Sequence, residues 1–260
     1  MKGMIIPVYE KYEQIALNNI IKLREKLGFQ EPIEIWQSGE EVSKEFISRL
    51  EGIPAITMRN VLELETDATF WRGFQIKAFA CKHTSFGEFI LCDADATFLR
   101  NPSILWRDRK YRATGAYFFR DLRHWKFRDL GPSTENPHAV AIFEKRKRWL
   151  RGLLPTESPY FPREWHYIYE NSIPVEPVAE AYMESGVVCI DGNRHAKAID
   201  RIFELNRKYE ETYQVIHGDK ETFWIGFCMA NEPYTMNWKY PTNRVKLTQY
   251  YGLRKFYVQK

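Results

Sequence analysis

The 260-residue sequence lacks the short motifs that mark several common enzyme classes. It contains no G-x-G-x-x-G, no G-x-x-x-x-G-K-[ST], no H-E-x-x-H and no G-x-S-x-G. The residues that form dinucleotide-binding, P-loop, zinc-protease and serine-hydrolase sites are therefore absent. No apolar run approaches the roughly 18 residues that a membrane-spanning helix needs. No repeat or low-complexity tract is present. These absences narrow the classes of site that the chain can hold.

Cysteine is scarce, and neither sign of charge dominates. The four cysteines form no C-x-x-C pair and lie in apolar contexts, which predicts reduced, buried thiols rather than disulfides or a zinc site. The 38 basic and 34 acidic residues give a net charge of +4 with mixed signs, so no nucleic-acid partner is expected. The first residues are too short and too interrupted for a secretion signal. The chain as given is therefore expected in the cytoplasm.

Apolar periodicity predicts an α/β protein. Hydrophobic residues make up 44% and aromatic residues 15% of the chain, which is ample for one packed domain of this length, residues 1–260. Period-2 or continuous apolar runs predict strands at 3–8, 33–36, 53–58, 88–92, 112–119 and 186–190. Helical spacing predicts helices at 12–27, 42–50, 70–82, 194–213 and 218–229. This alternation is typical of a Rossmann-like sheet flanked by helices.

Two stretches do not follow the alternation. Residues from about 120 to 182 are rich in proline and aromatic residues around one basic helix near 138–152, which predicts an insertion over the sheet edge. The basic run at 145–148 suits either a solvated helix face or a peripheral contact with an anionic membrane. The tail from Asn231 is aromatic and basic, without clear periodicity.

Two carboxylates mark the end of a predicted central strand. In "FILCDADATF", Asp93 and Asp95 are spaced so that both side chains point to the same face if the strand continues, while Ala94 points to the other. The edge where parallel strands end is where open α/β sheets bind ligands. A D-x-D pair suits Mg²⁺ or Mn²⁺, which take oxygen ligands and bridge diphosphate oxygens. The same triplet also occurs in ordinary surface turns.

The same residues fit a second pattern, that of haloacid-dehalogenase phosphatases. With Thr97 the run reads D-x-D-x-T, in which Asp93 would be the nucleophile and Asp95 the general acid. About ninety residues precede the motif here, whereas that family has it near the start. The string at 218–221 also lacks the second late aspartate that such a metal site needs.

Four separated strings together resemble one family, the outer-chain α-mannosyltransferases. The strings are "GFQIKAFACKHTSFGEFILCDADATFLRNP", "TGAYFFRDL", "ESGVVCIDGNRHAKAI" and "HGDKETFWIGF". The resemblance implies a GT-A-like fold with a central mixed sheet, and a retaining transfer of mannose from GDP-mannose to a glycan hydroxyl, aided by Mn²⁺ or Mg²⁺. The chain is more distantly similar to glycogenin-like transferases, so a UDP-hexose donor stays open. A lumenal Golgi enzyme is implied if the chain is a fragment of a longer, anchored protein.

The resemblance also implies roles for individual residues. It makes Asp93 and Asp95 metal ligands, with Asp93 also reaching the donor. It places Asp219, Glu184 and Asp121 at the reacting sugar, although Arg120 replaces the proline that the family usually has before this aspartate. The implied donor-binding residues are Pro7, Val8, Tyr9, Lys77, Asp93, Ser185, Gly186, Lys220 and Lys255.

One position departs from the glycogenin-like pattern. Those relatives add a histidine ligand in H-x-x-G-x-x-K, whereas this chain reads "QYYGLRK" with Gln249 at the histidine's place. Gln249 is therefore the expected third metal ligand, through a neutral oxygen that binds transition metals more weakly than imidazole. A glycan-binding module with a decayed site is the remaining alternative.

Overall fold

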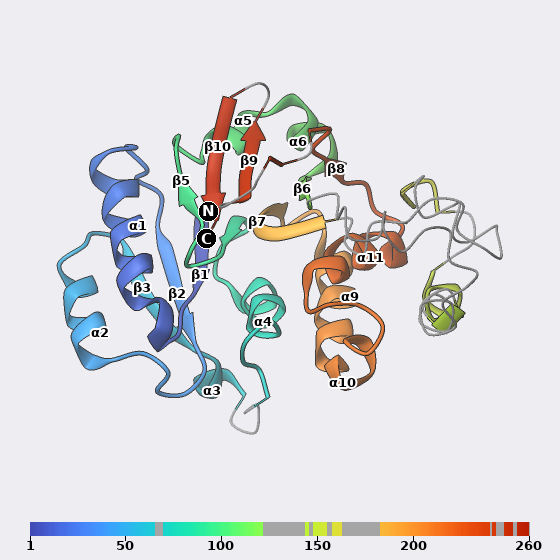
Figure 1. Cartoon of the computed structure of the whole chain (residues 1–260), viewed down its shortest axis with the longest axis horizontal. Helices are drawn as coiled ribbons and strands as arrows, with labels where there is room; N and C mark the ends of the chain where they lie inside the picture. Colours follow the sequence, from blue (N-terminus) through green and yellow to red (C-terminus); the bar gives the residue numbers. More distant parts are fainter. Residues whose placement is uncertain are drawn as a thin grey trace.

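A seven-stranded mixed sheet forms the centre of the protein, with strand order β3-β2-β1-β4-β7-β6-β8 (Figure 1). The fold is that of a computed structural model, which describes residues 1–65, 70–121, 144–145, 148–154, 158–162, 183–239, 241–242, 247–251 and 254–259. The strands of this sheet are β1 (Lys2–Pro7), β2 (Ile33–Gln37), β3 (Ile56–Asn60), β4 (Glu88–Cys92), β6 (Ala116–Arg120), β7 (Met183–Asp191) and β8 (Thr235–Met236). A second sheet has the order β5-β10-β9, from β5 (Thr97–Phe98), β9 (Leu247–Tyr251) and β10 (Arg254–Gln259).

The direction of the strands brings several chain ends to one edge of the large sheet. Strands β3, β2, β1 and β4 are parallel neighbours, and helices connect them in sequence. Strand β7 is antiparallel to both β4 and β6. The carboxyl ends of β1, β4 and β6 therefore meet the start of β7 at the same edge. This arrangement confirms the predicted mixed, Rossmann-like sheet.

Helices cover both faces of the sheet, as Figure 1 shows for α1 and α2 on one side and α4, α9 and α11 on the other. The side chains of β4 alternate accordingly: Phe89 and Leu91 join one buried cluster, and Ile90 and Cys92 join the other. The helices are η1 (Glu10–Tyr12), α1 (Glu13–Glu25), α2 (Lys44–Glu51), α3 (Val61–Leu64), α4 (Ile76–His83), α5 (Ile104–Arg107), α6 (Arg109–Thr114), α9 (Ala196–Arg207), α10 (Tyr209–Thr212) and α11 (Lys220–Ala230).

Helix α11, which carries one end of the site, is fixed by close packing on α9. A Cβ atom at Gly226 would lie 2.5 Å from Ile202 Cγ1 and 3.1 Å from the Ala198 carbonyl oxygen, so only glycine allows this approach. The helix ends at Asn231, which adopts the left-handed conformation that often closes helices. Its start at Lys220 is consequently held in place relative to the sheet.

Two sequence predictions were wrong in detail, and for a third region no elements were predicted. Residues 112–114 belong to helix α6, because Asp108 accepts hydrogen bonds from Lys110 N and Tyr111 N and Gly115 ends the helix at φ +77°. The helix predicted at 194–213 is divided at Lys208 into α9 and α10. The tail from Asn231 contains β8, β9 and β10, whose pairing partners lie far away in the sequence.

The predicted insertion lies largely outside the described residues. Its described parts include a helical stretch at 148–153 and the segment 158–162. Leu150, Leu154 and Phe161 are buried in the cluster that contains α11, and the Phe161 ring lies edge-on to Trp224 at 5.9 Å. These parts therefore pack on the domain. The membrane contact suggested for 145–148 concerns residues that are only partly described and stays a prediction, as does the single-domain boundary.

Two expectations about composition can be compared with the structure. All four cysteines, Cys81, Cys92, Cys189 and Cys228, are free and buried, as predicted. Among the helices in the described ranges, none has the length and apolar character needed to cross a bilayer.

Candidate active site

The predicted acidic pair lies at the sheet edge where β4 ends. Asp93 N donates to the Gly186 carbonyl oxygen of β7 at 2.9 Å, so the pair begins where β4 and β7 separate. Ala94 is buried, whereas Asp93 and Asp95 are partly open. The alternation predicted from "DAD" is thus present.

A buried asparagine from α1 fixes the loop that carries these carboxylates. Asn19 Nδ2 donates to the Ala94 carbonyl oxygen at 2.9 Å, and its Oδ1 accepts from the Thr97 hydroxyl at 2.8 Å. Asn19 was not singled out from the sequence, because a polar residue on a helix normally faces solvent. Thr97, the last position of the phosphatase-like pattern, here anchors the loop.

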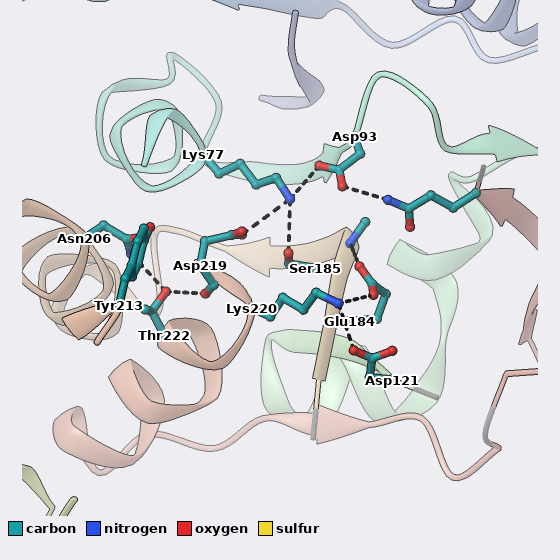
Figure 2. Close-up of polar contacts among 12 residues, drawn as sticks. Lys77, Asp93, Asp121, Glu184, Ser185, Asn206, Tyr213, Asp219, Lys220 and Thr222 are labelled. Carbon is teal, nitrogen blue, oxygen red and sulfur yellow. Dashed lines mark hydrogen bonds and ion pairs between the residues drawn. The ribbon is translucent and has the colours of Figure 1, made fainter. Parts of the chain in front are cut away.

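Lys77 of α4 links three groups that the sequence placed in one site. Its Nζ lies 2.6 Å from Asp93 Oδ1 and 3.4 Å from Asp219 Oδ2, and it donates to Ser185 Oγ at 3.1 Å (Figure 2). Lys77 is only 8% exposed and Asp219 only 1% exposed. These contacts bring together residues from α4, the β4 end, β7 and the start of α11.

Lys220 forms a second, adjacent cluster. Its Nζ lies 2.8 Å from Asp121 Oδ2, at the end of β6, and 3.0 Å from Glu184 Oε2 on β7 (Figure 2). Both carboxylates are almost fully buried, but the Lys220 side chain keeps 28% exposure. Lys220 is therefore the more accessible of the two site lysines.

The backbone of β7 is irregular where it passes the site. The register with β6 shifts between the pairs Tyr117–Cys189 and Phe119–Glu184. Within this irregular stretch, Glu184 Oε1 accepts a hydrogen bond from Gly186 N at 3.0 Å. Such bulges re-aim side chains next to binding sites. A Cβ atom at Gly186 would lie 2.3 Å from Gln259 Oε1, so the absent side chain makes room for Gln259.

Burial and opposite charges decide the protonation of the cluster. Burial alone would lower the pKa of Lys77, but the carboxylates of Asp219 and Asp93 outweigh it and raise that pKa well above its usual range. Burial likewise opposes the charge of Lys220, and Glu184 and Asp121 raise its pKa instead. Both lysines therefore carry a positive charge at neutral pH.

The pKa values of three carboxyl groups are also raised, but here burial is the main cause. Burial raises the pKa of Asp219, and Lys77 offsets this only in part. Burial also raises the pKa of Glu184 against the lowering effect of Lys220. For Asp95, burial and then the neighbouring Asp93 raise the pKa to about 6. The site thus concentrates more negative charge than its two lysines neutralise.

The end of β1 contributes one accessible aromatic residue. Val8 is buried, and its backbone N–H donates to the Trp36 carbonyl oxygen, while Pro7 ends the strand. Tyr9 is 40% exposed and lies edge-on to Tyr12 at 4.8 Å. Burial, a hydrogen bond with Tyr12 and the charges of Asp93 and Asp95 raise the pKa of Tyr9 to about 12. Tyr9 is therefore a neutral ring near the acidic pair.

Two predicted residues of the C-terminal strands lie differently. Lys255 is exposed on β10, and the described residues include no partner that ties it to the site. Gln249 is fully buried on β9 and donates from Nε2 to the Arg120 carbonyl oxygen at 2.7 Å, next to Asp121. Its role as a metal ligand stays a prediction.

Gln259 is a second residue of the site, besides Asn19, that the sequence did not reveal. Its Nε2 donates to Asp93 Oδ2 at 3.0 Å, across 166 positions of sequence. It lies on β10, in the tail where no periodicity was visible. Its position at the end of the apolar run 256–258 is the only local signal, and that signal is weak.

Comparison with solved structures places this arrangement in the GT-A glycosyltransferase fold. Core-mannan synthase A (CmsA/Ktr4) from Aspergillus fumigatus, in its Mn/GDP form, matches with a TM-score of 0.53 and 14% identity over 90% of this chain and 72% of that chain. The mannosyltransferase Ktr4p from Saccharomyces cerevisiae matches with a TM-score of 0.50 and 10% identity over 87% of this chain and 65% of that chain. Identities this low establish the fold alone.

The sequence itself gives the family. The family described as "Mannosyltransferase putative" matches residues 1–250, and the chain belongs to it. Relatives include the "Putative alpha-1,3-mannosyltransferase MNN15" of Candida albicans, 25% identical over 91% of this chain and 35% of its own length. The alpha-1,3-mannosyltransferase MNT3 of Saccharomyces cerevisiae is 23% identical over 91% of this chain and 39% of its own length. The chain thus spans little more than a third of these curated relatives.

Proposed function

We propose that the chain is a retaining, metal-dependent glycosyltransferase domain that transfers mannose from GDP-mannose to a hydroxyl group of a glycan. The observation that carries this proposal is the ion pair of Lys77 with Asp93 of the acidic pair, beside the Lys220 cluster, at the carboxyl edge of a GT-A sheet. Family membership and the names of the mannosyltransferase relatives favour mannose over other hexoses.

The residues present fit a hard divalent cation, Mn²⁺ or Mg²⁺. Asp93 and Asp95 offer carboxylate oxygens, the ligands that such ions prefer. The clusters around Lys77 and Lys220 join five carboxylates with two ammonium groups, namely Asp93, Asp95, Asp121, Glu184 and Asp219. That surplus of negative charge would repel a diphosphate unless a cation were bound. When bound, the ion neutralises charge on the departing diphosphate.

The two lysines have different parts in this proposal. An ammonium group has three N–H donors. Lys77 is almost fully enclosed by Asp93, Asp219 and Ser185, so it fixes those groups. Lys220 has two carboxylate partners among the described residues and partial exposure, which leaves an N–H for a diphosphate oxygen.

The reaction then needs no dedicated base. The bond between the sugar C1 and the phosphate oxygen breaks, and its electron pair goes to the diphosphate, where Lys220 stabilises the charge. The acceptor oxygen forms its bond to C1 on the same face and gives its proton to that diphosphate oxygen. Asp219 and Glu184 are buried beside the two lysines, where they can hold sugar hydroxyls or stabilise positive charge on the sugar.

A donor screen tests the proposal. The purified chain is incubated with GDP-mannose, UDP-glucose or UDP-galactose and a mannoside acceptor, with Mn²⁺, Mg²⁺ or EDTA, and products are read by mass spectrometry. Transfer or hydrolysis of GDP-mannose that needs the cation and disappears in Asp95→Asn is expected. Turnover of a UDP-sugar alone would replace the donor assignment. Turnover that is unaffected by EDTA would refute metal dependence.

A further inference from the structure

The described residues give the acidic pair no third carboxylate, histidine or cysteine. No group of three or more such side chains with metal-binding geometry occurs among them. Hard cations, however, also take amide oxygens in their coordination shell. The search for a third protein ligand therefore turns to glutamine and asparagine side chains near Asp93 and Asp95.

Gln259 is placed between the two acids of the pair. Its amide Nε2 donates to Asp93 Oδ2 at 3.0 Å, and the same amide lies close enough to the Asp95 side chain to interact with it. The other end of the amide, Oε1, is buried and has no hydrogen-bond partner among the described residues. A buried polar atom without a partner is uncommon in a folded protein and usually reflects a ligand, ion or water.

The backbone near Gln259 is shaped for this side chain. Its amide lies over Gly186, where any Cβ atom would collide with it. The two ends of a glutamine amide are nearly isosteric, and rotation about the last side-chain bond exchanges its oxygen and nitrogen. After that rotation Oε1 takes the present position of Nε2, beside Asp93. The amide oxygen then faces the carboxylates of the acidic pair.

Gln249 offers less to the same ion. Its Oε1 is also buried without a hydrogen-bond partner among the described residues, but its nitrogen donates to the Arg120 carbonyl oxygen and not to the acidic pair. Gln249 pairs with Tyr257 across the two strands. Tyr257 and Gln259 are two positions apart on β10, about 7 Å along a strand. Gln249 therefore lies about one such step further from the acidic pair.

We propose that Gln259 is the third protein ligand of the divalent cation, and that its amide rotates to present Oε1 beside Asp93 and Asp95 when the ion binds. This inference rests on the proposed metal dependence and specifies which residue supplies the third protein ligand. The third ligand would then lie on β10. It would not be Gln249, which aligns with the histidine of the glycogenin-like enzymes.

Histidine substitution with a spectroscopic readout tests the assignment. Mn²⁺ is bound to the purified chain with GDP, and pulsed electron paramagnetic resonance records nitrogen coupling to the ion in Gln259→His and, as a matched control, Gln249→His. Directly coordinated imidazole nitrogen is expected in Gln259→His only. Gln259→Leu should weaken Mn²⁺ binding by about tenfold in calorimetry.

The other outcomes are distinguishable. Nitrogen coupling in Gln249→His, or in neither variant while both bind Mn²⁺, overturns the assignment but leaves metal dependence intact. No Mn²⁺ binding by the wild type overturns both proposals. If the histidine variant fails to fold, Gly186→Ala is the substitute test. The added Cβ atom should displace the Gln259 amide while Gln259 itself stays unchanged. An unchanged Mn²⁺ affinity in a folded Gly186→Ala protein would also count against a ligand at Gln259.

Discussion

Replacing Lys77 with methionine should destabilise the protein strongly, because the buried Asp219 and the partly open Asp93 would lose their shared cation. Lys77 is enclosed between Asp93 and Asp219, and Asp219 is only 1% exposed. Removing one partner of a buried ion pair typically costs about 3–5 kcal/mol, a large share of the 5–15 kcal/mol that holds a typical domain folded. The free energy of unfolding, measured by urea denaturation at pH 8 in EDTA, should fall by that amount.

The same helix supplies a matched control. Lys82 pairs with Asp200 at the surface, where its side chain is 38% exposed. Exposed pairs contribute about 0–1 kcal/mol, so Lys82→Met should leave the unfolding curve nearly unchanged. The double variant Lys77→Met/Asp219→Asn should recover part of the lost stability, since one uncompensated charge is removed.

The pH dependence gives the prediction a definite sign. Burial already raises the pKa of Asp219, and loss of Lys77 would raise it further. A carboxyl group with a raised pKa in the folded state contributes stability below its unfolded pKa and loses it as the pH rises through the folded value. The deficit of Lys77→Met should therefore be largest at pH 8 and shrink toward pH 5. A deficit equal to that of Lys82→Met, or one that does not change with pH, would refute the reasoning.

Three further substitutions have definite expected outcomes. Burial and Asp93 raise the pKa of Asp95 to about 6, so Asp95→Asn should stabilise the metal-free protein by about 1–2 kcal/mol at pH 8 but not at pH 4. If the variant and the wild type had the same urea midpoint at both pH values, the prediction would be contradicted. Lys220→Met should weaken GDP binding in the presence of Mn²⁺ by about tenfold in calorimetry, since a charged hydrogen bond is worth about 1.5–3 kcal/mol. Lys208 is exposed, and Lys208→Met serves as the control that should leave GDP binding unchanged. Burial opposes the charge of Glu34, but hydrogen bonds from Thr84, Ser85 and Arg59 lower its pKa overall, so Glu34→Gln should cost about 2–4 kcal/mol at pH 7. That loss should narrow as the pH falls below about 4, because a lowered pKa gives stability that acid removes; a constant gap between the denaturation curves would count against it.

The local parts of the site were predictable from the sequence, because they depend on strand alternation and chain direction. The run "FILCDADATF" alone places Asp93 and Asp95 on one side at the end of a strand, and the structure has them there. The helix-flanked, Rossmann-like sheet followed from the alternation of apolar runs with helical spacing, and its mixed character from the resemblance to GT-A-fold enzymes. The resemblance implied roles for Lys77, Glu184, Asp219 and Lys220. In the structure they form two contacting pairs, Lys77 with Asp219 and Lys220 with Glu184.

The parts that the sequence did not predict depend on long-range pairing. Strands β9 and β10 form a separate small sheet with the two-residue β5. A two-residue strand has no detectable periodicity, and the tail has none either, so the sequence did not predict this sheet. Gln259 acquires its role only because β10 pairs with β5, just after the acidic motif. Asn19 likewise looks like an ordinary polar residue of a helix until its contact with the Ala94 carbonyl is known.

The antiparallel course of β7 has a consequence for how such a domain can diversify. Arg120 and Met183 are paired neighbours, so the sequence between them leaves and rejoins the scaffold at adjacent points, next to Asp121 and Glu184. Exchange of that one segment would alter the chain that joins Asp121 to Met183 and would leave the residues of β6 and β7 unchanged. New acceptor preferences could thus arise in evolution, or in the laboratory, by grafting a single stretch of chain.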